Sequence, residues 1–251
     1  MPAVEVVLLV AAALTAGTVD AIAGGGGLIT LPMLLALGLP PHQALATNKG
    51  QSVFGSGGAL ATYWSHGQID PSKVALTFPL GALGSLVGAV ILLAVPPAVM
   101  RPIVITLLIA AAVVLVARKP VRAPAAQTPR RLALAAGLAL VVGVYDGFFG
   151  PGTGTFLIVG FVVLCGETLT AATADAKVVN FASNLAAVAL FASQGKVLWS
   201  VALPMAGGQL VGGMLGARLA VRGGARVIRF AVVAVSSALV VKLVHDAWVA
   251  S

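Results

Sequence analysis

The chain has 251 residues, of which 59% are hydrophobic and 9% are charged, and its mean hydropathy is +1.07. A soluble globular domain carries about 25% charged and roughly 45–50% apolar residues. Because so few polar side chains cannot cover the surface of a soluble domain, the composition excludes a cytosolic enzyme, a nucleic-acid-binding protein and a disordered chain. It predicts a protein that crosses a membrane several times.

The formal net charge of +8 and the single cysteine set further limits. The basic residues lie mainly between apolar runs, where lysine and arginine set the orientation of a membrane protein, so nucleic acid is not an expected partner. The one thiol, Cys165, lies inside an apolar run and can build neither a disulfide framework nor a thiolate metal cluster. We expect no metal and no other cofactor.

Apolar runs follow one another along the chain, so the lipid bilayer is an expected partner. A helix that crosses the bilayer needs about 20 residues, because the hydrocarbon core is about 30 Å thick. The runs 28–39 and 154–166 are too short to cross, and each follows a glycine-rich break. The longer runs are 4–22, 43–64, 74–95, 98–117, 132–149, 169–192, 199–217 and 225–248.

The two glycine breaks belong to two halves that carry similar residues in the same order. Asp20 stands shortly before the first break, and Asp146 stands at the same distance before the second. Lys49 and Lys177 then follow at matching places, each about two turns into a long run. Chance does not keep an aspartate, a glycine break and a lysine in one order twice, so we expect an internal repeat.

The repeat divides the chain into three parts. Residues 1–117 form the first transmembrane repeat, residues 132–251 form the second, and residues 118–131 form a basic, proline-rich linker. This linker and the segment after residue 217 hold most of the arginines and lysines. Both are therefore expected in the cytoplasm.

With both basic segments on one side, each short run must return to the side from which the helix before it entered. We therefore predict an all-α polytopic membrane protein with two inverted repeats, each a broken-helix re-entrant hairpin plus three transmembrane helices. Both termini are expected outside. Inverted repeats whose broken helices meet at the bilayer midplane are the architecture of secondary transporters.

The breaks are the first candidate for a binding site. The first N–H groups of a helix have no partner within the helix and lie at the positive end of its dipole, so two such ends that meet in the membrane would bind an anion. Close packing by small residues is the alternative interpretation. The expected binding residues at the breaks are Gly25, Gly26, Gly27, Leu28, Gly152, Thr153, Gly154 and Thr155.

The charged residues inside the runs are the second candidate. Ionisable side chains within membrane spans are costly and usually functional, so Lys49 and Lys177 are expected to attract the anion unless they extend to the membrane surface. Asp20 and Asp146 could bind a coupling proton, pair with the lysines or cap the broken helices. Asp175, two residues before Lys177, could pair with it or lie in a loop.

Polar side chains recur at helical spacing around the two lysines. Asn48, Ser52 and Ser56 share one helix face in the first half, and Asn180 with Asn184 share a face in the second. We expect Asn48, Ser52 and Asn180 to hydrogen-bond substrate oxygens. Hydrogen bonding between helices is the alternative, and the sequence does not separate the two.

Four segments around the breaks and the lysines form a specific combination. They are Asp20-Ala-Ile-Ala-Gly-Gly-Gly-Gly-Leu-Ile-Thr-Leu-Pro32, Ala46-Thr-Asn-Lys49, Tyr145-Asp-Gly-Phe-Phe-Gly-Pro-Gly-Thr-Gly154 and Ala176-Lys-Val-Val-Asn180. Together they closely resemble the TauE/SafE sulfite exporter family, and most of all its broadly distributed branch of bacterial membrane transporters. The resemblance covers essentially the whole chain.

This resemblance implies transport of a sulfur-containing anion, such as sulfite, sulfoacetate or another organosulfonate, across the cytoplasmic (inner) membrane of a bacterium. It also implies that an ion gradient drives the transport. The family's binding residues carry over only to the matched glycines and to Asn48, Lys49, Lys177 and Asn180.

The sequence therefore predicts a secondary transporter, not an enzyme, that moves a small anion by alternating access with a proton as the candidate coupling ion. A passive anion channel is the first alternative. An intramembrane serine hydrolase built on Ser56 and His245 is the second, and it leaves the duplicated aspartates, glycines and lysines unexplained. Glycine-rich helices could serve a homodimer as easily as internal packing.

Overall fold

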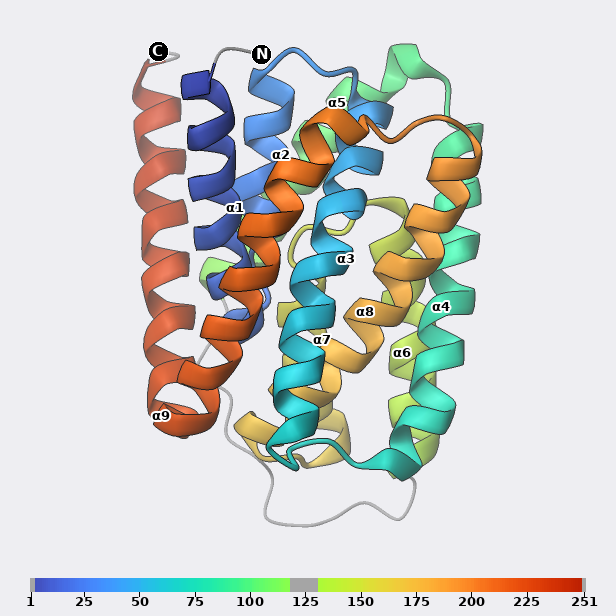
Figure 1. The fold of residues 1–251 in the computed structure, drawn as a ribbon, viewed down its shortest axis with the longest axis vertical. Coiled ribbons are helices and arrows are strands. Elements are labelled where there is room, and N and C mark those ends of the chain that lie inside the picture. The colour runs from blue at the N-terminus through green and yellow to red at the C-terminus, as the bar shows by residue number, and fades with distance from the viewer. Residues whose placement is uncertain (1–2, 118–130, 250–251) are drawn as a thin grey trace.

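The computed structural model describes residues 3–117 and 131–249, which form helices and no strands. Of the predicted linker, 118–131, only Arg131 falls within the described residues. The helices are α1 (Ala3–Ala23), α2 (Gly27–Ala36), α3 (Pro41–Ser65), α4 (Pro71–Ala94), α5 (Pro97–Ala117), α6 (Arg131–Phe148), α7 (Thr153–Cys165), α8 (Leu169–Ser193) and α9 (Trp199–Val249) (Figure 1).

Four of these helices, α1, α4, α6 and α8, are both long enough and apolar enough to cross a bilayer. Helix α3 has 25 residues, but it buries polar side chains such as Asn48, Lys49 and Gln51, which lower its hydropathy. Helix α9 joins the predicted runs 199–217 and 225–248 across a kink at Gly224. The prediction of an all-helical, multi-pass membrane protein is confirmed.

Both short helices follow a break where the sequence predicts one. Helix α1 ends at Ala23, and Gly24 turns the chain with a φ of +78°, a conformation that residues with a side chain rarely adopt. Helix α6 ends at Phe148, and Gly150 and Gly152 turn the chain in the same way before α7. Helices α2 and α7 have only 10 and 13 residues, which is too short to cross the bilayer. Each instead forms a hairpin with the helix before it.

The two hairpins open toward opposite ends of the bundle (Figure 1). The hairpin α1–α2 opens toward the end at which α1 begins and α9 ends, and the hairpin α6–α7 opens toward the other end. The first and last described helices therefore begin and end at the same side of the protein.

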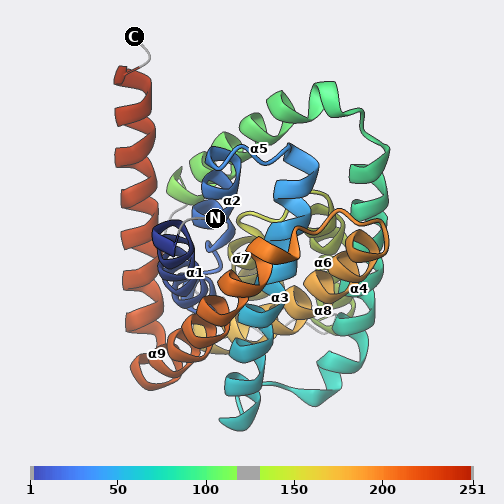
Figure 2. The same ribbon diagram turned by 45° about the horizontal axis from the view of Figure 1, so that its top comes forward.

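Glycines allow two pairs of helices to approach closely. Helix α4 crosses α6 at Gly84 and Gly88, where an added Cβ would overlap the backbone of α6. Helix α9 crosses α1 at Gly208 and Gly212 in the same manner. The second arm of α9, after Gly224, stands beside α1 at the edge of the bundle (Figure 2). Such small-residue contacts hold helices together in lipid, where van der Waals packing replaces the hydrophobic effect.

Replacing Gly88 with alanine should destabilise the protein. The added methyl group would overlap the carbonyl oxygen of Val144 on α6, and overpacking of this kind typically costs about 1–3 kcal/mol. Gly137, also on α6, provides the matched control, because an added Cβ there meets no atom within 4 Å. Thermal unfolding in detergent should show a lower melting temperature for Gly88→Ala and an unchanged or higher one for Gly137→Ala. Equal melting temperatures would contradict this account.

Candidate functional site

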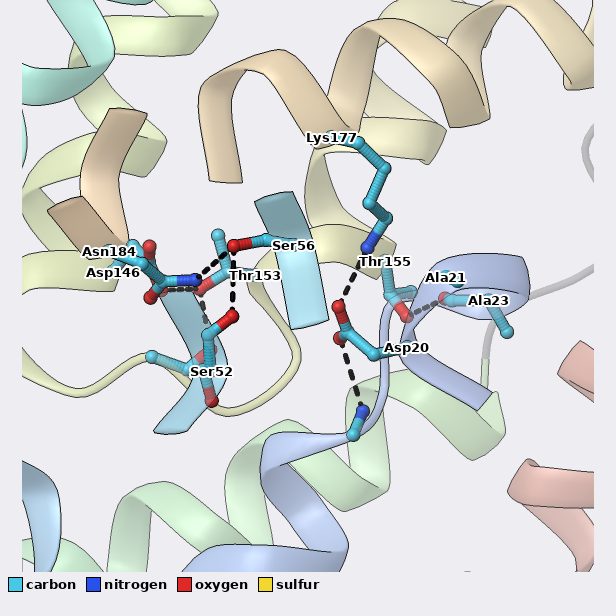
Figure 3. Close-up of polar contacts among 12 residues, drawn as sticks. Asp20, Ala21, Ala23, Ser52, Ser56, Asp146, Thr153, Thr155, Lys177 and Asn184 are labelled. Atoms are coloured by element: carbon cyan, nitrogen blue, oxygen red, sulfur yellow. Dashed lines mark hydrogen bonds and ion pairs between the residues drawn. The ribbon is translucent and has the colours of Figure 1, made fainter. Parts of the chain in front are cut away.

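The tips of the two hairpins touch each other inside the bundle. The Thr155 amide donates a hydrogen bond to the Gly24 carbonyl oxygen at 3.3 Å, and the Thr155 hydroxyl donates to the Ala23 carbonyl oxygen at 2.7 Å (Figure 3). Gly24 and Gly154 lie so close that a Cβ on either would overlap the backbone of the other. The close approach of the two backbones therefore requires glycine at both tips.

The Asp20 carboxylate joins its own hairpin to α8. One of its oxygens accepts a hydrogen bond from the Gly26 amide at 3.2 Å, and the other lies 2.8 Å from the Lys177 ammonium nitrogen (Figure 3). The Lys177 side chain is completely buried, so Asp20 and not water compensates its charge. Asp20 therefore combines two of the roles considered for it, because it caps the break and pairs with a lysine.

The Asp146 carboxylate makes the corresponding ion pair between α6 and α3. It lies 2.7 Å from the Lys49 ammonium nitrogen and accepts a hydrogen bond from the Thr153 hydroxyl at 2.8 Å. Lys49 also donates to the side-chain oxygen of Asn184 at 3.0 Å. Lys49 and Asp146 are both buried, as is Lys177, so neither lysine extends to the membrane surface.

A small cavity of about 30 Å³ lies between the two hairpin tips and helices α3, α8 and α9. On the measure in which one water needs roughly 10–15 Å³, it has room for about two waters. Both aspartates and one of the lysines reach its wall, together with backbone of both breaks. The lining residues are Asp20, Gly26, Gly27, Asn48, Lys49, Ser52, Asp146, Gly150, Gly154, Asn180, Asn184 and Gln209.

Seven of the binding residues expected from the sequence line this cavity. They come from both breaks and from the polar faces of α3 and α8, which the sequence places far apart. They are Gly26, Gly27, Asn48, Lys49, Ser52, Gly154 and Asn180.

The other expected binding residues are not among those that line the cavity, and most have a structural partner. Leu28 packs in the apolar core, and Gly152 takes the left-handed turn that begins α7. Thr153 orients Asp146, and Thr155 joins the hairpin tips. Lys177 pairs with Asp20. The last of the set, Gly25, is buried in the first break.

Two polar residues of α3 already have partners within the protein. The Asn48 side-chain oxygen accepts hydrogen bonds from the Thr30 hydroxyl at 2.6 Å and from the Gln51 side chain at 2.9 Å. The Ser56 hydroxyl donates to the Ser52 carbonyl oxygen and accepts from the Asn184 side chain (Figure 3). Ser56 thus joins α3 to α8. His245, its proposed partner in a hydrolase, has no described side chain.

The sequence interpretation missed three lining residues. Gly150 belongs to the second break but was not assigned to the site, and Asn184 was noted only as part of the polar face of α8. Gln209 reaches the cavity from α9, where it is the one amide side chain in the apolar run 199–217. Its polarity within that run was a usable signal, but nothing in the sequence told which way the helix turns it.

Two ion pairs and two helix N-termini lie at or beside the cavity. The ion pairs Asp20–Lys177 and Lys49–Asp146 are each neutral as a unit. The N-termini of α2 and α7 both reach the cavity and contribute partial positive charge. Backbone amides at helix N-termini are well suited to hold an anion.

A sequence profile described as Sulfite exporter TauE/SafE matches residues 9–243. The chain belongs to this family. The expectation drawn from the residues around the two breaks is therefore confirmed.

Relatives of this TauE/SafE protein carry transporter names. The chain is 42% identical over 240 residues to "Probable membrane transporter protein ORF9" of Sinorhizobium sp, which covers 95% of this chain and 92% of that protein. It is 39% identical to "Probable membrane transporter protein YfcA" of Escherichia coli K12, over 93% of this chain and 87% of the relative. A "Probable membrane transporter protein" of Haemophilus influenzae is 37% identical, over 92% and 91%.

No solved structure matches the chain significantly. The family and the relatives' names indicate a membrane transporter and not an enzyme, as the sequence predicts.

Removing one partner of the buried pair Lys49–Asp146 should cost far more than removing both. Lys49→Met leaves an unpaired buried carboxylate, which typically costs about 3–5 kcal/mol. The double variant Lys49→Met, Asp146→Asn should recover most of this loss, because asparagine can still accept from Thr153. Lys196→Met, at an exposed lysine, is the control and should change little. Thermal unfolding of the unmodified protein, Lys49→Met, Asp146→Asn alone, the double variant and the control measures the coupling, and additive effects at Lys49 and Asp146 would refute the pairing.

Proposed function

We propose that the protein is a secondary transporter that moves a small sulfur-containing anion, such as sulfite, sulfoacetate or another organosulfonate, across the cytoplasmic membrane of a bacterium by alternating access. One observation carries the proposal: residues at the N-terminal ends of α2 and α7 line one cavity together with Lys49.

The chemistry of the cavity wall suits an oxyanion. Gly26, Gly27 and Gly154 have no side chains, so a ligand can approach their backbone closely. Asn180 and Ser52 add side-chain groups that can hydrogen-bond an oxyanion. Sulfite and sulfonates carry several oxygens in a compact group and can use several of these donors at once.

The ion pair Lys49–Asp146 provides a cation that a bound anion could share. The Lys49 ammonium already contacts both Asp146 and Asn184. An anion in the cavity would compete with Asp146 for this ammonium, and the freed carboxylate would keep the Thr153 hydroxyl as a donor. Proton coupling through Asp20 or Asp146 stays a prediction.

Several contacts support two inverted repeats. Helix α1 packs on α9 as α6 packs on α4, and α3 packs on α9 as α8 packs on α4. The aspartate of each predicted half pairs with the lysine of the other. A cavity with room for about two waters is narrow for sulfite, so the hairpin tips would separate when the anion enters. The proposed orientation places both termini outside and the turn at Gly224 in the cytoplasm.

A passive channel would need a continuous path past the hairpin tips, and their direct contact between Thr155 and Gly24 argues against one. The two mechanisms differ in counterflow. If the protein is a transporter, unlabelled sulfite trapped inside proteoliposomes should accelerate the entry of labelled sulfite several-fold. A channel would show no such acceleration, and that result would favour the alternative.

Sulfite should raise the melting temperature of the purified protein, because a ligand that binds only the folded state stabilises it. Asn180→Ala removes a lining side chain and should weaken sulfite binding about tenfold, equivalent to roughly 1.4 kcal/mol. Gln194→Ala, at the exposed end of the same helix, should bind as the unmodified protein does. If a broad panel of sulfonates and other oxyanions gives no shift, the proposed substrate class is wrong.

A further inference from the structure

A second group of buried charges lies apart from the cavity, where the beginnings of α4 and α8 meet. Lys73, in the first turn of α4, places its ammonium nitrogen 2.8 Å from Glu167 Oε1 and 2.7 Å from Asp175 Oδ2. Glu167 stands in the connection between α7 and α8, and Asp175 stands on α8. One ammonium therefore faces two carboxyl groups.

With both carboxyl groups ionised, this cluster carries an uncompensated negative charge. The side chains of Glu167 and Asp175 are 1% and 6% exposed, and the remaining oxygens, Glu167 Oε2 and Asp175 Oδ1, are buried without a hydrogen-bond partner. A buried charge and a buried acceptor without a donor are both costly. One proton held between these two oxygens would remove both costs, because a protonated carboxyl is a donor.

Within residues 3–117 and 131–249, no second cation forms an ion pair with these carboxyl groups. Asp70, at the start of α4, adds a further negative charge at the surface. At the end of α7, the Cys165 thiol donates to the backbone oxygen of Arg131. Arg131, at the start of α6, takes no part in the ion pairs of the cluster. Lys73 is thus the cation that contacts both carboxyl groups.

The environment of Glu167 shifts the pKa of its carboxyl group toward neutral pH. Burial, reinforced by the nearby Asp175 carboxylate, raises the pKa of Glu167 from 4.5 to about 7. The folded protein then holds a proton in this interval that the unfolded chain has released. The free energy of unfolding should therefore fall as the pH rises from about 4.5 through about 7.

We propose that Glu167, Asp175 and Lys73 form the proton-binding site of the transporter. This inference rests on the proposed transport function and adds its coupling ion. Protonation leaves Lys73 and one carboxylate as a neutral unit that ties α4 to α8. Release of the proton leaves a negative cluster that favours hydration, and so favours separation of the two helices at this end.

Helix α8 connects this proton site to the cavity. It carries Asp175 at the cluster, Lys177 in the ion pair with Asp20, and Asn180 and Asn184 on the cavity wall. A displacement of α8 that follows proton release therefore moves substrate contacts as well. Two ligands that each favour one position of the same element are coupled, and the coupling is reciprocal.

The first-half position that corresponds to Asp175 holds no titratable side chain. The repeat aligns Asp175 with Thr47, and the Thr47 hydroxyl accepts a hydrogen bond from the Leu198 amide at 3.0 Å. A neutral hydrogen bond thus stands where the other half has an ionic cluster. The carboxyl groups of the proton site therefore belong to the second half alone, and the proposed orientation places the site toward the cytoplasm.

Glu167→Gln tests the proposal first without any substrate. The variant imitates the protonated side chain, so its melting temperature should stay nearly constant between pH 4.5 and about 7, whereas that of the unmodified protein should fall over this interval. Asp70→Asn, on the same side and still able to cap α4, is the matched control and should keep the fall. A Glu167→Gln profile that still falls would overturn the proposal.

Proteoliposomes with labelled sulfite then test coupling. If one proton accompanies each anion, a gradient of one pH unit supports up to about tenfold accumulation in the unmodified protein and in Asp70→Asn. Glu167→Gln should let sulfite equilibrate but not accumulate, and accumulation by this variant would refute the coupling role. If Glu167→Gln does not fold, Asp175→Asn removes the same shared proton and should give the same losses.

The two proposals fail in different ways. If no sulfite or sulfonate enters with the unmodified protein, the proposed substrate is wrong, and the substrate-free stability profile still decides whether the cluster binds a proton. If sulfite is transported and Glu167→Gln accumulates it normally, the transport function holds and the proton site is wrong.

Discussion

Four charged side chains lie in the interior of the helix bundle and compensate one another in two ion pairs, Asp20 with Lys177 and Lys49 with Asp146. In a membrane an unpaired buried charge is too costly to keep, so each carboxylate must stay within reach of its lysine. Because each pair joins a hairpin to a long helix of the other half, this requirement also fixes the two hairpins against α3 and α8. The contact between the tips and the cavity beside it depend on that placement.

The three lysine–carboxylate groups in the described part of the chain differ in net charge. The two pairs at the cavity are neutral and present the positive ends of α2 and α7 to a ligand. In the third group one lysine contacts both Glu167 and Asp175, and the net negative charge of the group favours binding of a proton. Neutral pairs beside helix ends suit an anion, whereas an unbalanced group suits a proton, so substrate and coupling ion are assigned to separate places joined by α8.

Several features of this arrangement were readable from the residues. The breaks, the short helices after them and the pairs of aspartates and lysines within the apolar runs follow from glycine content, run length and the positions of the charged residues. The partners of these charges were not readable. The sequence left Asp20 open between proton binding, pairing and capping, and it left Asp175 open between Lys177 and a loop. Asp175 instead pairs with Lys73 on α4, because the packing of α4 on α8 brings together residues that lie far apart in the chain.

The sequence by itself determined that this chain is a helical membrane protein with two interrupted hairpins and a TauE/SafE transporter pattern, because composition, hydrophobic run length and glycine breaks are local properties. Only the tertiary structure decided which of the expected residues face the cavity. Gly26, Ser52 and Asn180 line it, while Thr155 joins the hairpin tips and Leu28 packs in the apolar core. That selection depends on the rotation of each helix and on which helices cross, and both are set by contacts between residues far apart in the chain.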